Sequence, residues 1–427
     1  MMKLNYKKVI FTGFAFFLIC AFWQAYDNVI PLILTNKFGM NQTWSGVIMA
    51  LDNLFALFLL PLFGALSDKT NTKFGRRTPY IFIGTICAVL FFIFLPLIDT
   101  LWLFILVLLL VLLSMSIFRS PAVALMPDVT CKPYRSKANA VINLMGTAGG
   151  MIVLVFGTIF KTSEEHKTDF FPYILATAGL MLLGLIVFLL TVREKKWAAE
   201  MIEDAEKYFP DKEEEERETV GGKLTKSQVV SLVLILASVA LWYMGYNAVT
   251  SKYSLYATNV LGHDYNLTMM IAQGAAIIAY IPVGLVASKM GRKKTVLIGV
   301  ALLFTAFLTA AFMRKGSSPI IMYTLFALAG IGWATINVNS FPMVVELAKS
   351  SDTGRYTGFY YTASMAAQTL TPVLSGVIMD AAGNMLPLFF YAAAMVGGSF
   401  LTMLFVRHGD SKPEKLQNKI EAFADND

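Results

Sequence analysis

The chain has 427 residues, of which 56% are hydrophobic and only 15% charged, and its mean hydropathy is +0.62. This composition excludes a soluble globular protein of this length and indicates an integral membrane protein. The formal net charge of +7 does not indicate nucleic-acid binding, because the basic residues lie in short loops beside apolar runs. Two of the three cysteines, Cys20 and Cys87, lie within apolar runs, so no disulfide framework is implied.

The apolar segments long enough to cross a bilayer as helices of about 20 residues form two sets of six. In chain order they are residues 9–34, 43–66, 78–98, 100–127, 137–160 and 170–192, and then 227–253, 267–289, 295–313, 318–346, 355–380 and 386–406. Lysines precede the first segment, as in a signal peptide, but that segment contains Asp27 and lacks a clear cleavage site, so we expect a retained helix. The expected fold is all-α and integral to the membrane, with twelve transmembrane helices.

The polar segments predict the domains and the orientation. We expect a six-helix half over residues 1–192, a charged connector over 193–226, a second six-helix half over 227–407 and a tail over 408–427, with the connector and tail solvated or partly helical. If the N-terminus is inside, the inner segments hold 28 Lys and Arg residues and the outer loops hold 6. Both termini are therefore predicted to be cytoplasmic in a cell (plasma) membrane protein.

A basic loop, GALSDKTNTKFGRRTP from Gly64 to Pro79, joins the second and third apolar segments, and a weaker copy, GLVASKMGRKK, begins at Gly284. A repeated polar joint indicates a repeated membrane unit. Here the sequence resembles the major facilitator superfamily, whose halves carry a G-x-L-a-D-r-x-G-R-R loop at this place. The resemblance implies two pseudo-symmetric halves around a central cavity that opens alternately to each side. The matching residues are Gly64, Leu66, Asp68, Gly75, Arg76 and Arg77.

Acid-to-base pairs recur at corresponding helix ends of the two halves. They resemble the inner gate of facilitator-superfamily sugar carriers, in which such charges lock the cytoplasmic face in one state and separate in the other. Anchoring of the topology alone is the alternative. The residues that the resemblance assigns to this gate are Asp68, Arg76, Arg77, Asp128, Arg135, Glu346 and Arg355.

A narrower resemblance lies in FRSPAVALMPDVTCKPYRSKANA, from Phe118 to Ala140. It is similar to the region between the fourth and fifth helices of the sucrose–proton symporters, which carry a G-P-x-x-A-L-x-x-D pattern. Ser120 stands where glycine is usual, and Asp128 matches the acid. The resemblance implies proton-driven uptake of a disaccharide or other glycoside.

Three ionisable residues lie inside expected spans: Asp27, Asp52 and Arg119. A charge near the bilayer centre costs at least about 2.5 kcal/mol, so each is a candidate functional residue. An apolar cavity favours the protonated form of a carboxyl group and a nearby arginine favours the charged form, so such a group can load and release a proton. We expect Asp27 to carry the proton, with Asp52 second. Interhelical hydrogen bonds for the acids, or a packing role for Arg119, are the alternatives.

Amide and aromatic side chains recur on faces of several spans. Amides both donate and accept hydrogen bonds, and flat rings cover the C–H face of a sugar, so this combination favours a neutral, hydroxyl-rich ligand. Helix bridging and packing remain the alternatives for each residue. The substrate-binding candidates are Trp23, Gln24, Asn139, Asn143, Tyr243, Tyr246, Asn247, Gln273, Trp333, Asn337, Tyr360 and Gln368.

Other classes of function fit less well. The sequence has no G-x-x-x-x-G-K-[ST] phosphate loop and no cluster of residues with metal-ligand spacing, so we expect neither an enzyme nor a bound cofactor or metal. The expected partners are a sugar, a coupling cation and membrane lipid, without nucleic acid, and the expected state is a monomer. A sodium-coupled glycoside symporter and a proton antiporter for drugs or organic cations stay open.

Overall fold

The computed structural model describes residues 4–131, 134–208, 225–345, 347 and 353–410. Over these residues the chain forms helices and no strand, with one isolated β-bridge between Thr72 and Gly75. The all-α fold expected from the sequence is confirmed. Contacts within the chain group it into two compact units, one of Met1–Gly39 and Leu51–Pro210 and the other of Met40–Ala50 and Asp211–Asn426.

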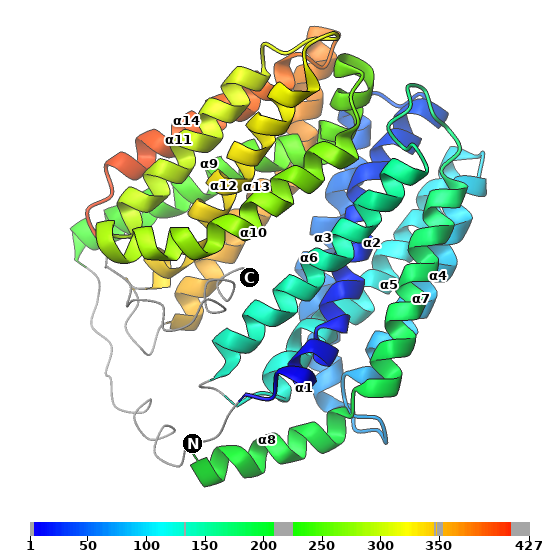
Figure 1. The fold of residues 1–427 in the computed structure, drawn as a ribbon, viewed down its shortest axis with the longest axis vertical. Helices are drawn as coiled ribbons and strands as arrows, with labels where there is room; N and C mark the ends of the chain where they lie inside the picture. Colours follow the sequence, from blue (N-terminus) through cyan, green and yellow to red (C-terminus); the bar gives the residue numbers. More distant parts are fainter. Residues whose placement is uncertain (1–3, 132–133, 209–224, 346, 348–352, 411–427) are drawn as a thin grey trace. The chain divides into compact units, whose positions relative to one another are not determined.

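The helices of the first part of the chain follow the six expected spans, the first of which is divided into α1 and α2, and add one more helix (Figure 1). They are α1 (Tyr6–Thr12), α2 (Phe14–Leu32) with a π-helical turn (Ile33–Lys37), α3 (Gln42–Lys69), α4 (Thr78–Phe94) with a 3-10 turn (Leu95–Leu97), α5 (Leu101–Asp128), α6 (Arg135–Ile159), α7 (Phe171–Thr191) and α8 (Glu194–Tyr208). The additional helix is α8, which occupies the first part of the charged connector.

The remaining helices follow the other six expected spans. They are α9 (Lys226–Tyr256) with a π-helical turn (Ala257–Leu261), α10 (Tyr265–Met290), α11 (Arg292–Ala310), α12 (Pro319–Val345), α13 (Thr353–Ala382) and α14 (Pro387–Leu404). By length and apolarity, ten helical segments of the described residues are able to cross a membrane. The other two expected spans are α10 and α13, which are 26 and 30 residues long.

Local sequence explains where several helices begin and end. Proline stands in the first turn of α4, α7 and α14, where its missing N–H costs nothing. The helix α9 begins with a capping box in which Thr225 and Gln228 satisfy each other's backbone donors. Pro31 removes a backbone donor near the end of α2, directly before the chain widens into a π-helical turn.

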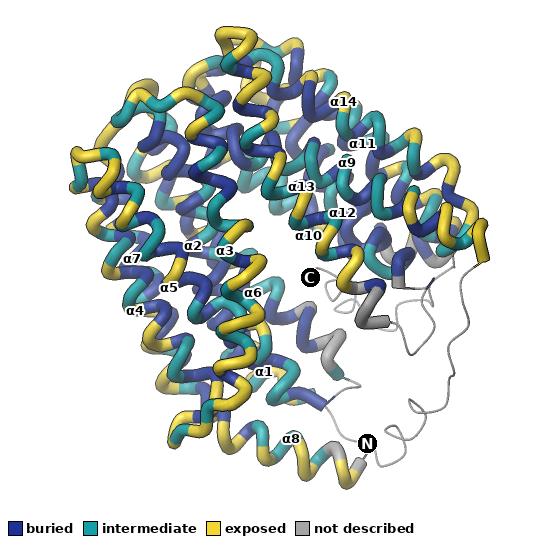
Figure 2. Tube along the Cα trace, turned by 180° about the vertical axis from the view of Figure 1, so that it is seen from behind, coloured by how far each residue is buried: buried dark blue, intermediate teal, exposed yellow. Residues whose placement is uncertain are grey.

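Burial follows the contacts between helices within each unit (Figure 2). In the first unit α2 packs against α6, α7 and α5, and most of its residues are buried. Large apolar side chains on other faces are exposed, such as Leu190 at 72% and Ile278 at 75%. A water-soluble protein would hide such side chains, whereas lipid solvates them.

Candidate functional site

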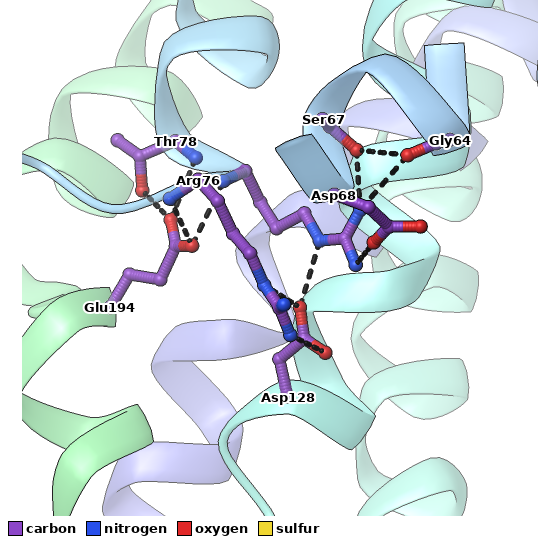
Figure 3. Close-up of polar contacts among 8 residues, drawn as sticks. Gly64, Ser67, Asp68, Arg76, Thr78, Asp128 and Glu194 are labelled. Carbon is purple, nitrogen blue, oxygen red and sulfur yellow. Dashed lines mark hydrogen bonds and ion pairs between the residues drawn. The ribbon is translucent and has the colours of Figure 1, made fainter. Parts of the chain in front are cut away.

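The basic loop between α3 and α4 folds around the side chain of Arg77, which is 5% exposed. Its Nε donates a hydrogen bond to Oδ2 of Asp128 at 2.8 Å. Its two terminal nitrogens donate to Asp68, on the last turns of α3, and to the hydroxyl of Ser67. Figure 3 shows Ser67 and Asp68 of α3 and Asp128 of α5 around this guanidinium. The structure therefore brings together the gate candidates Asp68, Arg77 and Asp128.

Arg76 completes this charge cluster from the more exposed side. Its Nε and one terminal nitrogen contact the two carboxylate oxygens of Asp128 at 3.1 and 2.7 Å, a bidentate arrangement (Figure 3). Asp128 thus binds two arginines at once. Burial alone would lower the pKa of Arg77, but its hydrogen bonds and charge interactions with Asp128 and Asp68 outweigh this and raise that pKa.

Glu194, the first residue of α8, is a member of this site that sequence analysis missed. Its Oε1 accepts hydrogen bonds from the backbone N–H groups of Arg76 and Arg77 at 2.7 and 2.9 Å. Its Oε2 accepts from the backbone and hydroxyl of Thr78 at 2.8 and 2.7 Å. Glu194 therefore caps the N-terminus of α4 and fixes the turn that carries both arginines.

A glycine makes room for this cap. Gly75 has φ +119°, and a Cβ added to it would lie 2.2 Å from the carboxyl carbon of Glu194. The loop motif therefore needs glycine here for both its backbone angle and its lack of a side chain. The sequence offered no other sign of Glu194, because an acid at the start of a charged stretch is typical of a solvated helix.

A second contact region ties α8 to α1. Lys8 forms an ion pair with Glu200 and lies over the ring of Trp197, 5.8 Å from its centroid. The hydrogen bond from Lys8 lowers the pKa of Glu200. In Figure 1, α8 runs across the end of the helices of its own unit. Of the other gate candidates, Glu346 and the side chains of Arg135 and Arg355 lie outside the described residues.

The three intramembrane charges lie in one unit, Asp27 on α2, Asp52 on α3 and Arg119 on α5. Arg119 interacts electrostatically with both acids. Among the described residues, however, no ion pair within 4.0 Å joins it to either of them. Its guanidinium instead lies over the ring of Trp23, 5.3 Å from the centroid. The arginine is thus near both acids while resting on an aromatic ring.

Two polar atoms near these charges are buried without a hydrogen-bond partner among the described residues. Tyr26 interacts electrostatically with Asp27 and Asp52, and its hydroxyl is buried with no hydrogen-bond partner among the described residues. The indole N–H of Trp23 is also buried without a hydrogen-bond partner among the described residues. Buried polar groups are normally satisfied by protein, water or ligand. This arrangement suits a region that takes up water, a proton or a polar ligand.

The remaining candidates of the first unit lie on α2 and α6. Gln24 is half-buried one turn from Asp27. Asn139 is buried and Asn143, four residues later, is half-buried, so both stand on one face of α6. The hydroxyl of Thr147 donates to the backbone oxygen of Asn143, which continues this polar face.

The second unit holds the aromatic candidates. The rings of Tyr246 on α9 and Trp333 on α12 lie 5.8 Å apart with an interplanar angle of 24°, and Tyr280 packs edge-on against Trp333. Tyr280 was not among the residues expected from the sequence. Tyr243 stacks on Trp242 at 3.9 Å and forms a hydrogen bond with Tyr360, which also bonds to Ser340 at 3.0 Å.

The amide candidates of this unit accompany these rings. Asn247 lies next to Tyr246 on α9, and Asn337 stands one turn after Trp333 on α12. Gln368 donates a hydrogen bond to the backbone oxygen of Ser364 at 3.4 Å on α13, and Gln273 lies half-buried on α10. The Oδ1 atom of Asn247 is buried without a hydrogen-bond partner among the described residues.

Comparison with known proteins gives the same architecture. The family model of the Major Facilitator Superfamily matches residues 12–339 and again residues 263–424. Among solved structures, the chain is similar to the nucleoside transporter NupG, with 13% identity, a TM-score of 0.67 and coverage of 94% of this chain and 100% of the other. It is also similar to the inward-open xylose transporter XylE from E. coli, with 14% identity, a TM-score of 0.67 and coverage of 95% and 97%.

A peptide transporter of the POT family, solved in complex with alafosfalin, is similar over 94% of this chain and 93% of the other, with 13% identity and a TM-score of 0.69. Identities this low establish the fold and not the substrate. The fold has the twelve membrane-crossing helices that the sequence predicted. The chain is therefore a multi-pass membrane transporter of a small molecule rather than an enzyme, and it belongs to the Major Facilitator Superfamily.

Proposed function

We propose that the protein is a secondary active transporter that moves a sugar, a disaccharide or glycoside, together with protons by alternating access. The observation that carries this proposal is the placement of Asp27, Asp52 and Arg119 near one another on three membrane-crossing helices of one unit. Ionisable groups within spans are costly and are the usual elements of proton relays. Both termini would be cytoplasmic in a cell-membrane protein that works as a monomer.

The coupling follows from charge balance. Two carboxylates near each other resist being ionised together, and one arginine balances one of them, so the group favours one bound proton. We assign that proton to Asp27, with Asp52 as its alternate site. Loss of the proton would draw Arg119 from Trp23 towards the carboxylates. Such a shift changes the attraction between α2, α3 and α5. A transport cycle requires a change of this kind, because protonation has to favour one conformation over another.

The sugar would contact amides and aromatic rings among the substrate-binding candidates. In the second unit, Tyr246, Trp333 and Tyr243 supply rings and hydroxyls, while Asn247 and Asn337 supply amides. Such groups recognise a neutral, hydroxylated ligand. The likeness of residues 118–140 to the sucrose–proton symporters supports a disaccharide or glycoside.

The cluster of Arg76, Arg77, Asp68 and Asp128 would close the cytoplasmic side in one state of the cycle. The members of the cluster come from α3, from α5 and from the loop between α3 and α4. Movement of one of these helices would therefore break several contacts, which supports the role of a gate. The functional halves would be residues 1–192 and 227–407, joined by the connector 193–226 and followed by the tail 408–427.

The test is to purify the protein into liposomes and record external pH while adding disaccharides and monosaccharides, with and without sodium. Alkalinisation that depends on one sugar is the expected result. Sodium-dependent uptake without a pH change would move the protein to the sodium-coupled glycoside symporters, an alternative that the presence of two acids keeps open. No pH change and no sodium-dependent uptake with any sugar would contradict sugar transport and favour an exporter of drugs or organic cations.

A further inference from the structure

The indole ring of Trp23 is one of the substrate-binding candidates, yet a charged group of the protein itself lies over its face. The guanidinium carbon of Arg119 is 5.3 Å from the centroid of this ring. An aromatic face attracts a cation, a tryptophan face most strongly, and the attraction grows where water is excluded. Trp23 is half-buried on a membrane-crossing helix. Its ring therefore binds Arg119 in this conformation.

Two buried aromatic side chains of the same helix hold this ring in place. Phe22 and Tyr26 pack nearly edge-on against Trp23, each with 5.3 Å between ring centroids, and the interplanar angles are 81° and 78°. Both side chains are completely buried, and Phe22 also contacts Phe92 of α4 at 5.2 Å. Edge-on contacts between aromatic rings are favourable. The ring of Trp23 is thus a fixed platform for the arginine.

Neither intramembrane acid is paired with Arg119 in this arrangement. Asp52 accepts hydrogen bonds from the backbone N–H and the side-chain Nδ2 of Asn53 at 2.5 and 2.7 Å, so its partner is its own neighbour in the chain. Among the described residues, Asp27 accepts no hydrogen bond and forms no ion pair within 4.0 Å. Arg119 nevertheless interacts electrostatically with both acids. A change in its position therefore changes how strongly each carboxylate is stabilised.

The titratable groups that interact with one another at this place come from three helices of the first unit. They are Asp27, Cys20 and Tyr26 on α2, Asp52 on α3 and Arg119 on α5. Three further helices contact α2, and α4, α7 and residues 138–159 of α6 carry no Asp, Glu, His, Lys or Arg. Charged residues nearer the helix ends have partners of their own, namely Lys8, Lys37 and Asp128. The position of Arg119 therefore decides the charge balance around the two acids.

We propose that Trp23 is a positioning residue for proton coupling, whose ring holds Arg119 apart from Asp27 and Asp52 and thereby sets the pH at which these acids take up the proton. The proposal rests on the proton-coupled function proposed above. While the ring holds the arginine, the carboxylates lack a close cation and bind a proton readily. Without the ring, Arg119 is free to pair with a carboxylate, and protonation then requires a lower pH. Trp23 thus acts on transport through the arginine and the proton.

Fluorine NMR of the sugar-free protein tests the contact directly. The full-length chain in detergent is labelled with 5-fluorotryptophan at its six tryptophans, and the Trp23 resonance is the one missing from Trp23→Phe. This resonance is expected to shift with pH, because deprotonation draws Arg119 off the ring, and to stay constant in the double variant Asp27→Asn and Asp52→Asn. The resonance of the exposed Trp102 is the control. A Trp23 resonance that ignores pH, or that shifts equally in the double variant, overturns the proposal.

The pH profile of sugar exchange in liposomes, with equal pH on both sides, tests the consequence for transport. Trp23→Leu is expected to move the pH of half-maximal exchange about one unit towards acid, a tenfold loss of proton affinity, because the contact between cation and ring is lost. Trp23→Phe should shift the profile less, since a phenyl ring binds a cation more weakly. Trp102→Leu is the matched control and should leave the profile unchanged. A raised KM with an unshifted profile in Trp23→Leu would make Trp23 a sugar contact and overturn the proposal.

The two measurements separate this proposal from the proposed substrate. If the Trp23 resonance shifts with pH as expected but no sugar is exchanged, the positioning role stands and the sugar assignment is wrong. If sugar is exchanged and the profile of Trp23→Leu matches that of the wild type, sugar transport stands and the positioning role is wrong. If Trp23→Leu does not fold, the profile of Trp23→Phe and the Trp23 resonance of the wild type decide in the same way.

Discussion

Arg77 and Asp128, which lie 51 residues apart, form an almost buried ion pair with 2.8 Å between Nε and Oδ2, and their side chains are 5% and 15% exposed. Asp128→Asn removes the negative charge that pairs with Arg77 at this place. Breaking a buried ion pair is expected to lower the free energy of unfolding by about 3 kcal/mol. Asp68→Asn is expected to cost less, because Asp68 is 58% exposed. Thermal unfolding of the two variants in detergent checks this order, and an equal or reversed order contradicts it.

Removing the cap that α8 provides is expected to loosen the start of α4. Glu194→Ala deletes four hydrogen bonds to residues 76–78 and should lower the free energy of unfolding by about 1–2 kcal/mol. Hydrogen exchange of the amides of Arg76, Arg77 and Thr78 should become faster. Glu203→Ala, at an exposed position of the same helix, is the control. Equal exchange rates of these amides in the two variants would contradict a capping role for Glu194.

The attachment of α8 to α1 should depend on pH. Because the folded protein lowers the pKa of Glu200, the ion pair with Lys8 stabilises the fold fully above the ordinary value of 4.5 and loses that contribution as the pH falls through the lowered value. A spin label at the exposed residue Ile202 should become more mobile in that acidic range. In Glu200→Gln the mobility should be high at neutral pH already and insensitive to acid. A wild-type label that stays immobile throughout would speak against the attachment.

A substitution in the aromatic cluster tests the sugar site. Trp333→Ala removes the ring that faces Tyr246 and is expected to raise KM for the transported sugar about fivefold, since stacking contacts contribute about 1 kcal/mol. Trp333→Phe should recover part of the loss. Trp102→Ala removes a tryptophan that is 68% exposed and should leave KM unchanged. Equal KM values for Trp333→Ala and the wild type would exclude Trp333 from the site.

Periodic and local signals explain what the sequence predicted. Long apolar runs place all twelve spans, because a bilayer imposes length and apolarity on each helix separately. The basic loop was recognisable because its glycine, acid and arginines lie close together in sequence. The role of Glu194 was not recognisable, because its partners at residues 76–78 are more than a hundred positions away in the sequence.

Residues near helix ends were also difficult to interpret from the sequence. Lys252 and Asp380 fall at the ends of expected spans, where a charge ordinarily faces the headgroups. Only the fold shows that both meet the first turn of α3. Likewise, the nearness of Arg119 to Asp27 and Asp52 depends on how α2, α3 and α5 pack, which residue patterns in single helices do not specify.

The central claim is that Asp27 couples a proton to sugar movement. In liposomes, we would compare sugar accumulation driven by a pH gradient with sugar exchange at equal pH, for the wild type, Asp27→Asn and the exposed control Asp169→Asn. Asp27→Asn is predicted to lose accumulation and keep exchange, while Asp169→Asn behaves as the wild type. Accumulation by Asp27→Asn at the wild-type level would contradict the assignment.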